Sequence, residues 1–397
     1  MRILVLSFYY RPDLSAASFR MTALVETLRD RMPPGSHIDV VTTLPNRYAS
    51  FTAGAPRSEA YPGVSIRRIA LGRHQSGMLD QSAAFFGFAR EAMATVEARD
   101  YDLVFATSSR LMTAVLGAWI ARRKKAKLYL DIRDIFADTI KDVLPAVVSA
   151  VAKHVSSALE TFALRRADKV SVVSPGFLEY FGRRYPQQRF SCFTNGVDDE
   201  FLNAGPTGRS PSPRSAGAGT VTVLYAGNVG DGQGLHLIIP RLARELSARA
   251  HFKVVGDGGR RGQLEAALRA ARVTNVELRP PVGRQQLLET YRAADVLFLH
   301  LNDYAAFEKV LPSKLFEYAA MGKPVLAGVS GFAAEFVRSE ITNSAVFSPC
   351  DLAGAVRSLD DLILEDAPRT EFVVKYGRAA ISQRMAEDVL SVAASTR

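Results

Sequence analysis

Short apolar runs alternate with helix-like segments along nearly the whole chain, and this alternation limits the fold more than any other feature of the sequence. In the first half the apolar runs are residues 3–7, 38–42, 65–69, 103–106, 128–130, 170–173 and 190–193. Helical periodicity lies between them, over residues 18–31, 81–99, 111–124, 147–167 and 175–185. Near-continuous apolar strands that are covered by helices form a parallel, doubly wound sheet. The sequence therefore predicts an α/β fold.

A second set of strands follows a segment, residues 203–219, that is made mainly of Gly, Pro, Ala, Ser and Arg. Its apolar runs are residues 221–226, 252–255, 276–278, 296–300, 325–327 and 345–347. Because 397 residues are too many for one compact core, two domains are expected. We predict a first Rossmann-like domain over 1–202, a linker over 203–219, a second Rossmann-like domain over 220–368 and a helical tail over 369–397. Such sheets bind ligands beyond the carboxyl ends of their strands, in a cleft that the two domains would share.

One lysine and one glutamate stand at the start of a short predicted helix within residues 311–328. Ser313 predicts the start of this helix, and Gly322 predicts its end. Backbone N–H groups at such a start, reinforced by Lys314, offer positive charge to a diphosphate. Glu317, one turn later, can accept hydrogen bonds from a ribose diol. The same pattern also fits an ordinary amphipathic helix with a surface Lys–Glu pair.

Two glycine-rich turns of the second domain extend this prediction of a nucleotide site. One follows the strand at 221–226 and the other follows the strand at 252–255, and each is expected to open a helix. Glycines let a phosphate approach the bare backbone, although they also serve plain tight turns. The predicted phosphate-binding residues of the two turns are Gly227, Gly230, Gly234, Gly256, Asp257 and Gly258.

The chain carries a formal net charge of +10, and a group of basic residues lies within residues 122–127. No aromatic-interleaved basic strand or recognition helix accompanies this group, which argues against a nucleic-acid partner. Apolar segments at 83–89 and 144–152 lie in the same half of the chain and favour an anionic membrane surface. A solvated face that keeps the protein soluble is the alternative.

The sequence lacks the usual patterns of a membrane span, a secretion signal and a metal site. No segment reaches the roughly 18–20 uninterrupted apolar residues that cross a bilayer, and no signal-peptide cleavage pattern follows the first strand-like run, so we expect a cytoplasmic protein. Cys192 and Cys350 lack the spacing of a disulfide framework or a zinc site. No Asp-x-Asp motif ends a strand, which favours a metal-independent protein, although Asp231 and Asp257 near the predicted phosphate site leave a divalent ion open.

Several short segments carry a resemblance to a known family. They are residues 9–13, 102–108, 131–136, 194–198 and 312–324 and the two glycine-rich turns. Taken in order, these segments resemble the family 4 retaining glycosyltransferases of the GT-B fold, and more narrowly the bacterial N-acetyl-fucosamine transferases of surface-polysaccharide assembly. The resemblance covers nearly the whole chain. It implies that the second domain binds a nucleotide-sugar donor, that the first binds an acceptor, and that the C-terminal helix crosses back to brace the first domain.

The activity that this resemblance implies is transfer of a sugar, an N-acetylated amino sugar by the narrower match, from a UDP-linked donor. The acceptor would be a lipid-diphosphate-linked sugar or another glycan in O-antigen or capsule assembly, at the cytoplasmic face of a bacterial inner membrane. No cofactor is expected. In the front-face mechanism of the family, the leaving phosphate oxygen itself takes the proton of the acceptor.

Roles on the donor side follow from the resemblance by position. Asn228 and Gln233 fall where the family carries basic residues on the phosphate turn, so Lys314 would carry more of the diphosphate charge, next to Ser313. Glu317 matches the second glutamate of a family pair. The first position of that pair falls on Lys309, with Glu308 beside it, and these two residues would contact the donor sugar.

Roles on the acceptor side are implied in the same way. Arg133, followed by Asp134, stands where the family often has an active-site His, and we assign both residues to catalysis together with Lys314. An internal salt-bridge cluster at a strand end is the alternative for residues 131–134. The acceptor itself would be contacted by Asp13, Ser15 and Arg20.

Two other functions fit the same two-domain pattern. A nucleotide-sugar 2-epimerase would share the fold and the donor site, but residues 7–13 lack the opening that such enzymes carry. A degenerate transferase that only binds a nucleotide-sugar is favoured by the neutral residues at positions 228 and 233.

Overall fold

The computed structural model describes residues 1–45, 54–71, 78–108, 110–135, 146–208, 210–211 and 219–395. This part of the chain forms two compact units. The first unit holds the described residues up to Asn195 and those from Arg378 onward, and the second unit is Gly196–Gly377. Each unit is built on a mainly parallel sheet with helices between its strands, as the alternating sequence pattern predicts.

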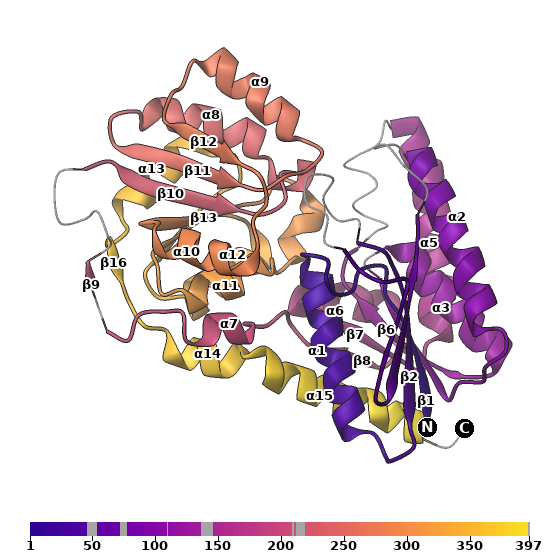
Figure 1. Ribbon diagram of the computed structural model, residues 1–397. Helices are drawn as coiled ribbons and strands as arrows, with labels where there is room; N and C mark the ends of the chain where they lie inside the picture. The colour runs from indigo at the N-terminus through magenta and orange to yellow at the C-terminus, as the bar shows by residue number, and fades with distance from the viewer. Residues whose placement is uncertain are drawn as a thin grey trace. The chain divides into compact units, whose positions relative to one another are not determined.

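An eight-stranded sheet forms the centre of the first unit, in the order β3-β4-β2-β1-β5-β6-β7-β8 (Figure 1). Its strands are β1 Arg2–Leu6, β2 His37–Thr43, β3 Ser58–Tyr61, β4 Val64–Ile69, β5 Leu103–Thr107, β6 Lys127–Ile132, β7 Lys169–Val172 and β8 Phe190–Cys192. The helices of this unit are α1 Ala16–Arg31, α2 Met78–Val96, α3 Leu111–Lys124, α5 Ala146–Arg166, α6 Pro175–Arg184 and α15 Arg378–Ala394. All pairs are parallel except the antiparallel pair of β3 with β4 at one edge.

The C-terminal helix α15 belongs to the first unit and lies beside α1 (Figure 1). Met385 and Val389 share an apolar cluster with Leu24 and Leu28 of α1. The carboxylate of Asp388 accepts a hydrogen bond of 2.7 Å from the hydroxyl of Tyr129. The far end of the chain therefore returns to complete the core that the N-terminal strands begin.

The second unit is centred on a six-stranded parallel sheet in the order β12-β11-β10-β13-β14-β15. Its strands are β10 Val221–Ala226, β11 Ala250–Val255, β12 Val276–Arg279, β13 Val296–His300, β14 Val325–Gly328 and β15 Ser344–Phe347. Its helices are α7 Asp199–Leu202, α8 Leu235–Glu245, α9 Arg261–Ala271, α10 Arg284–Arg292, α11 Lys314–Ala320, α12 Gly331–Glu340, α13 Leu352–Asp360 and α14 Thr370–Tyr376. Two 3-10 turns, η1 Asp231–Gln233 and η2 Ala305–Lys309, and the short pair β9 Ser210–Pro211 with β16 Glu365–Asp366 complete it.

Both faces of this second sheet are buried, which explains why its strands read as continuous apolar runs. In β10, Val223 and Tyr225 belong to the cluster on one face, and Leu224 and Ala226 belong to the cluster on the other. A sheet that is covered on both sides leaves no polar face for alternation. The doubly wound arrangement predicted for this half is therefore present.

The boundaries between the units differ from the predicted ones. The first unit ends at Asn195, earlier than residue 202, because α7 belongs to the second unit, where buried Phe201 packs 6.0 Å from the ring of Tyr291. The tail is divided at Gly377 instead of returning as one piece. Its first helix, α14, stays in the second unit because Phe372 packs against Phe316 of α11.

Two further expectations meet the structure only in part. Within the predicted linker over 203–219, the structure describes residues 203–208, 210–211 and 219, and these include β9, which pairs with β16. The edge strand β3 was not predicted from the apolar runs. Its side chains alternate between exposed and half-buried, so the segment lacks the apolar character by which the other strands are found.

Candidate functional site

Lys314 lies directly against the first glycine-rich turn of the second unit. A Cβ atom at Gly227 would stand 2.0 Å from both Cε and Nζ of Lys314, and Gly227 has a φ of +148°. The ammonium also lies 5.9 Å from the centre of the Tyr225 ring. Only a residue without a side chain lets the lysine approach the backbone here. The structure thus brings the start of α11 and the end of β10 together.

The second glycine-rich turn packs on the first, backbone against backbone. A Cβ atom at Gly256 would stand 1.8 Å from the carbonyl oxygen of Gly227, and one at Gly258 would stand 2.6 Å from that of Val229. The amide of Val229 donates a 2.9 Å hydrogen bond to the carbonyl of Asp257. The two turns, which the sequence could only suggest separately, therefore form one surface.

Gln233 organises the first turn from within. Its Oε1 atom accepts hydrogen bonds from Nδ2 of Asn228 (2.9 Å) and from the amide of Gly230 (3.1 Å). The two neutral residues that stand where the resemblance expects basic side chains are therefore bonded to each other, and they shape the loop.

A helix follows each of these turns, as expected, and Gly230 caps the 3-10 turn η1 that precedes α8. Helix α8 starts at Leu235 with Gly234 as its cap, and α9 starts at Arg261 with Arg260 before it. The amide of Gly258 donates to the carboxylate of its neighbour Asp257 at 2.8 Å. Gly258 serves the close packing of the second turn on Val229 of the first.

Arg260 supplies positive charge that sequence reasoning missed. Its Nε atom forms a 2.8 Å ion pair with Oδ1 of Asp231, and the hydroxyl of Tyr304 donates to Oδ2 of the same aspartate at 2.6 Å. Asp231 is thereby committed to protein partners. Among the described residues, no group of three or more His, Cys, Asp or Glu side chains could hold a metal ion.

Glu317 of α11 is held on both carboxylate oxygens. The hydroxyl of Tyr291 donates to Oε2 at 2.9 Å, and Nη1 of Arg284 lies 3.5 Å from Oε1. Burial, followed by the charge of Glu317, raises the pKa of Tyr291 well above its ordinary value. A carboxylate can accept about four hydrogen bonds, so this one keeps capacity for a ligand.

The residues predicted to contact the donor sugar lie in η2 beside the first turn. A Cβ atom at Gly232 would stand 2.8 Å from the ring of Phe307, which places η2 against η1. Glu308 is exposed and Lys309 is half-buried. The backbone of Glu308 packs against Gly331, because a Cβ atom at Gly331 would stand 2.2 Å from the carbonyl oxygen of Glu308. Ser313 precedes α11 without forming a side-chain capping bond.

His300 is a buried residue that the sequence did not single out, and it is hydrogen-bonded to the first glycine-rich turn. Its Nε2 atom accepts a 2.9 Å hydrogen bond from the amide of Cys350, so Nδ1 carries the proton that it donates to the carbonyl of Gln233 at 2.7 Å. Burial lowers the pKa of His300 to about 4. The ring is therefore neutral at physiological pH.

In the first unit, the predicted catalytic pair adjoins a buried ion-pair cluster at the end of β6. Arg20 donates to both carboxylate oxygens of Asp131, at 3.1 and 2.9 Å, and Ser171 donates at 2.8 Å. Arg133 lies 3.9 Å from Asp131, and its Nη2 donates to Asn195 at 3.3 Å. Burial lowers the pKa of Arg133 to about 10. The cluster proposed as the alternative for this motif is therefore present, while Asp134 is exposed.

The predicted acceptor residues are engaged within the fold. Arg20 is buried, and besides its bonds to Asp131 its guanidinium donates to the carbonyl of Thr194 at 2.9 Å. Ser15 caps α1 by accepting from the amide of Ser18 at 3.2 Å. Asp13 is buried. Asp13 and Ser15 lie in the loop before α1 and Arg20 lies within α1, and the role of these residues toward an acceptor stays a prediction.

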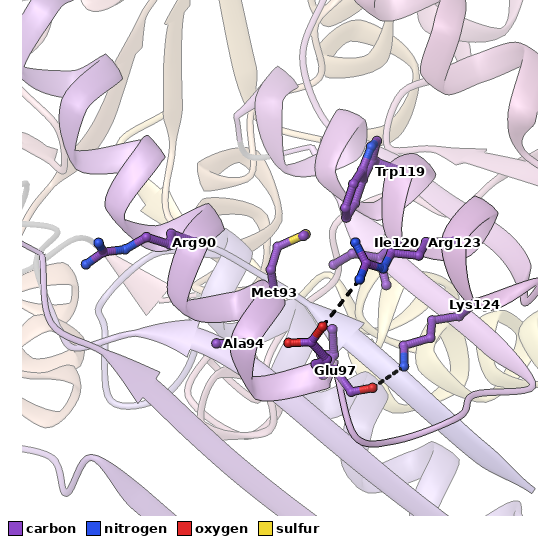
Figure 2. Close-up of a pocket in the computed structure, with 9 residues that line it drawn as sticks. Arg90, Met93, Ala94, Glu97, Trp119, Ile120, Arg123 and Lys124 are labelled. Atoms are coloured by element: carbon purple, nitrogen blue, oxygen red, sulfur yellow. Dashed lines mark hydrogen bonds and ion pairs between the residues drawn. The ribbon is translucent and has the colours of Figure 1, made fainter.

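A basic and aromatic face lies where α3 meets α2 and α5. Between α2 and α3, a hollow of about 200 Å³ is lined by Trp119 and Arg123, and the guanidinium of Arg123 lies over the indole at 5.5 Å (Figure 2). Arg123 also pairs with Glu97 at 3.3 Å. A second hollow of about 750 Å³ lies between α3 and α5. Its lining residues are Arg122, His154, Ser157, Ala158, Thr161, Phe162, Arg165 and Arg166.

Apolar side chains are exposed on the same helices. Phe86 of α2 is 72% exposed and Trp119 is 39% exposed. The predicted apolar segment at 144–152 lies outside the residues whose side chains the structure describes. None of the described helices is both long and apolar enough to cross a bilayer.

Comparison with known proteins shows the class to which this two-unit fold belongs. Residues 16–196 match the family model of the glycosyl transferase 4-like domain, and residues 220–364 match that of the glycosyl transferases group 1. The chain belongs to the glycosyltransferases that combine these two domains, and its two Rossmann-like units are those of the GT-B fold.

Individual relatives are distant. WcaI of Escherichia coli (strain K12), a protein assigned to colanic acid biosynthesis as a glycosyl transferase, is 31% identical over 100 residues. That match covers 25% of this chain and 24% of WcaI, so the chain spans about a quarter of the length of the curated relative that it matches. Anabaena Alr3699/HepE, crystallised with UDP and glucose, gives a TM-score of 0.60 at 18% identity over 98% of this chain and 96% of its own. WaaG, a glycosyltransferase involved in lipopolysaccharide biosynthesis, gives a TM-score of 0.59 at 15% identity over 98% and 97%.

Proposed function

We propose that this protein is a retaining glycosyltransferase that moves a sugar, an N-acetylated amino sugar, from a UDP-linked donor to a lipid-diphosphate-linked or other glycan acceptor in bacterial surface-polysaccharide assembly. The observation that carries the proposal is the approach of Lys314 to the bare backbone of Gly227, beside the second glycine-rich turn. The UDP bound in HepE and the polysaccharide roles named for WcaI and WaaG support it.

The donor roles are assigned within the second unit. The ammonium of Lys314 neutralises the diphosphate, the turn from Gly227 to Gly234 and the second turn supply backbone contacts, and the carboxylate of Glu317 accepts from the ribose diol. Glu308 and Lys309 are assigned to the donor sugar. We expect the reaction to need no metal ion or cofactor.

In the transfer step, the bond between the anomeric carbon and the diphosphate oxygen breaks, and the bond to the acceptor oxygen forms on the same face. The acceptor's proton passes to the leaving phosphate oxygen. Lys314 stabilises the negative charge that grows on that oxygen. Such electrostatic stabilisation of the transition state is usually the largest single contribution to the rate enhancement of an enzyme. Arg133 and Asp134 are assigned to the acceptor side, where Asp134 is the exposed member of the pair.

An anionic membrane surface is proposed as the place of action, at the cytoplasmic face of the inner membrane. Arg122, Arg123 and Lys124 close the last turn of α3, and the exposed aromatic rings of Phe86 and Trp119 lie on α2 and α3. Basic groups attract anionic headgroups, and aromatic rings settle at the interface.

The proposal is tested by a thermal-shift screen of UDP-, GDP- and dTDP-sugars, followed by assays with and without a glycan acceptor. A ligand that binds only the folded state stabilises it by about 2.7 kcal/mol at a hundredfold excess over Kd. UDP-sugars should give the largest shift, and UDP should be released, with the sugar transferred, only when an acceptor is present. Epimer formation from UDP-N-acetylglucosamine alone would identify an isomerase, and UDP binding without any turnover would identify a non-catalytic binder.

A further inference from the structure

Arg284, the first residue of α10, is shared among several carboxylates of the second unit. Its Nη2 atom donates to Asp198 at 2.6 Å and to Glu200 at 3.1 Å, and its Nη1 atom lies 3.5 Å from Oε1 of Glu317. The guanidinium also lies 4.8 Å from the centre of the Phe201 ring. One cation therefore connects the beginning of the second unit to the carboxylate of α11.

This connection is well shielded and stays charged. The side chain of Arg284 is 18% exposed and that of Asp198 is 9% exposed. Burial alone lowers the pKa of Arg284, but Glu317, Asp198 and Glu200 outweigh burial and raise it. The planar fork of a guanidinium can hold two carboxylates in fixed directions, whereas an ammonium acts as a point charge.

Glu317 is thus held from two directions, by Arg284 on one oxygen and by Tyr291 on the other. A carboxylate on a helix has several rotamers, and a ligand that needs one of them must otherwise bear the cost of selecting it. Because protein donors orient both oxygens of Glu317, the lone pairs that are left for a ligand point in one fixed direction.

We propose that Arg284 is a positioning residue of the donor site, which fixes the carboxylate of Glu317 for the ribose diol and so sets the preference for ribonucleotides. The inference rests on the proposed function of Glu317. Arg284 acts through Glu317 and touches no substrate.

The test compares UDP with 2′,3′-dideoxy-UDP by calorimetry on the full chain. The variants are Arg284→Met, which keeps the apolar stem, and Arg292→Met, a matched control at an exposed arginine of the same helix. In the parent and in Arg292→Met, we expect the Kd of UDP to be lower than that of dideoxy-UDP by about tenfold or more, because only UDP can form hydrogen bonds from its ribose diol to a charged group. In Arg284→Met the preference should fall toward one, through weaker UDP binding with dideoxy-UDP binding unchanged.

The outcomes separate this inference from the proposed function. If the parent binds both nucleotides equally, the ribose role of Glu317 is wrong. If the parent discriminates and Arg284→Met discriminates to the same degree, Glu317 stands and the positioning role of Arg284 is wrong. Should Arg284→Met fail to fold by circular dichroism, Arg284→Lys replaces it, because a lysine keeps the charge but cannot bridge Asp198 and Glu317. Full preference in Arg284→Lys would overturn the inference.

Discussion

At the scale of single residues, Lys314 is the cation that we assign to the diphosphate. Positions 228 and 233 of the first turn are neutral and cannot share this charge, and Arg260 is paired with Asp231. Because negative charge on a leaving diphosphate grows as the glycosidic bond breaks, Lys314→Ala should reduce kcat more than it weakens UDP binding. A loss of roughly a hundredfold in kcat is expected. Steady-state kinetics with calorimetry measures both, and exposed Lys375→Ala is the control. Weaker UDP binding with an unchanged kcat would show that Lys314 contributes only to binding.

His300 gives the second prediction at this scale. Its pKa of about 4 in the folded state lies below the ordinary value of 6.5, so below pH 6.5 the unfolded chain takes up a proton that the folded chain refuses. The contribution of His300 to the free energy of unfolding is therefore fully present above pH 6.5 and is lost as the pH falls toward 4. The loss amounts to at most about 3 kcal/mol. Urea unfolding at pH 7 and pH 4.5 should show a smaller pH effect in His300→Gln, which cannot ionise. The same pH effect in both proteins would contradict this role.

At the scale of elements, the two glycine-rich turns make a graded prediction. Gly256→Ala should prevent stable folding of the second unit, because its new Cβ atom would meet the rigid carbonyl of Gly227. Gly227→Ala should be milder, because flexible Lys314 can move away, but UDP binding should weaken. Gly262→Ala in α9 is the control, since nothing lies near its Cβ position, and it should be neutral or stabilising by up to about 1 kcal/mol. Thermal unfolding ranks the three variants, and equal effects at 256 and 262 would contradict the packing argument.

The same elements show what the sequence could and could not predict. Strands of the second unit were found because both of their faces are buried, and Lys314, Glu317 and the glycines were found because each lies in a short local motif. The sequence predicted that a helix follows each turn, but not the residue at which α8 or α9 begins, since local pattern does not tell a glycine at a helix start from one that packs a turn. Arg284 was missed because it meets Glu317 from 33 residues away, and only the fold makes that contact.

At the scale of the whole molecule, the charge of +10 should act through the face of α2, α3 and α5. The chain has a single tryptophan, Trp119, on that face, so its fluorescence should shift to the blue when anionic vesicles bind. Binding should weaken as salt rises, since each basic group contributes about 1 kcal/mol within a Debye length.

The variants for this prediction carry equal changes in charge. Replacing Arg122, Arg123, Lys124 and Lys125 by Gln should reduce co-sedimentation with vesicles and leave UDP binding intact. Replacing four exposed arginines of the second unit by Gln is the control; these are Arg241, Arg269, Arg272 and Arg292. If the two quadruple variants lose vesicle binding equally, or if the parent ignores anionic vesicles at low salt, the basic run is a solvated face.

The most direct test of the donor site is a calorimetric titration of UDP into the parent and into Glu317→Ala. Glu335→Ala, at an exposed carboxylate of α12, serves as the control. Losing hydrogen bonds to a charged group should weaken UDP binding in Glu317→Ala by about 1.5–3 kcal/mol, which is roughly a tenfold to hundredfold rise in Kd. The control should bind as the parent does. UDP binding to Glu317→Ala at the parental Kd would contradict the assignment of this unit as the site of a nucleotide-sugar donor.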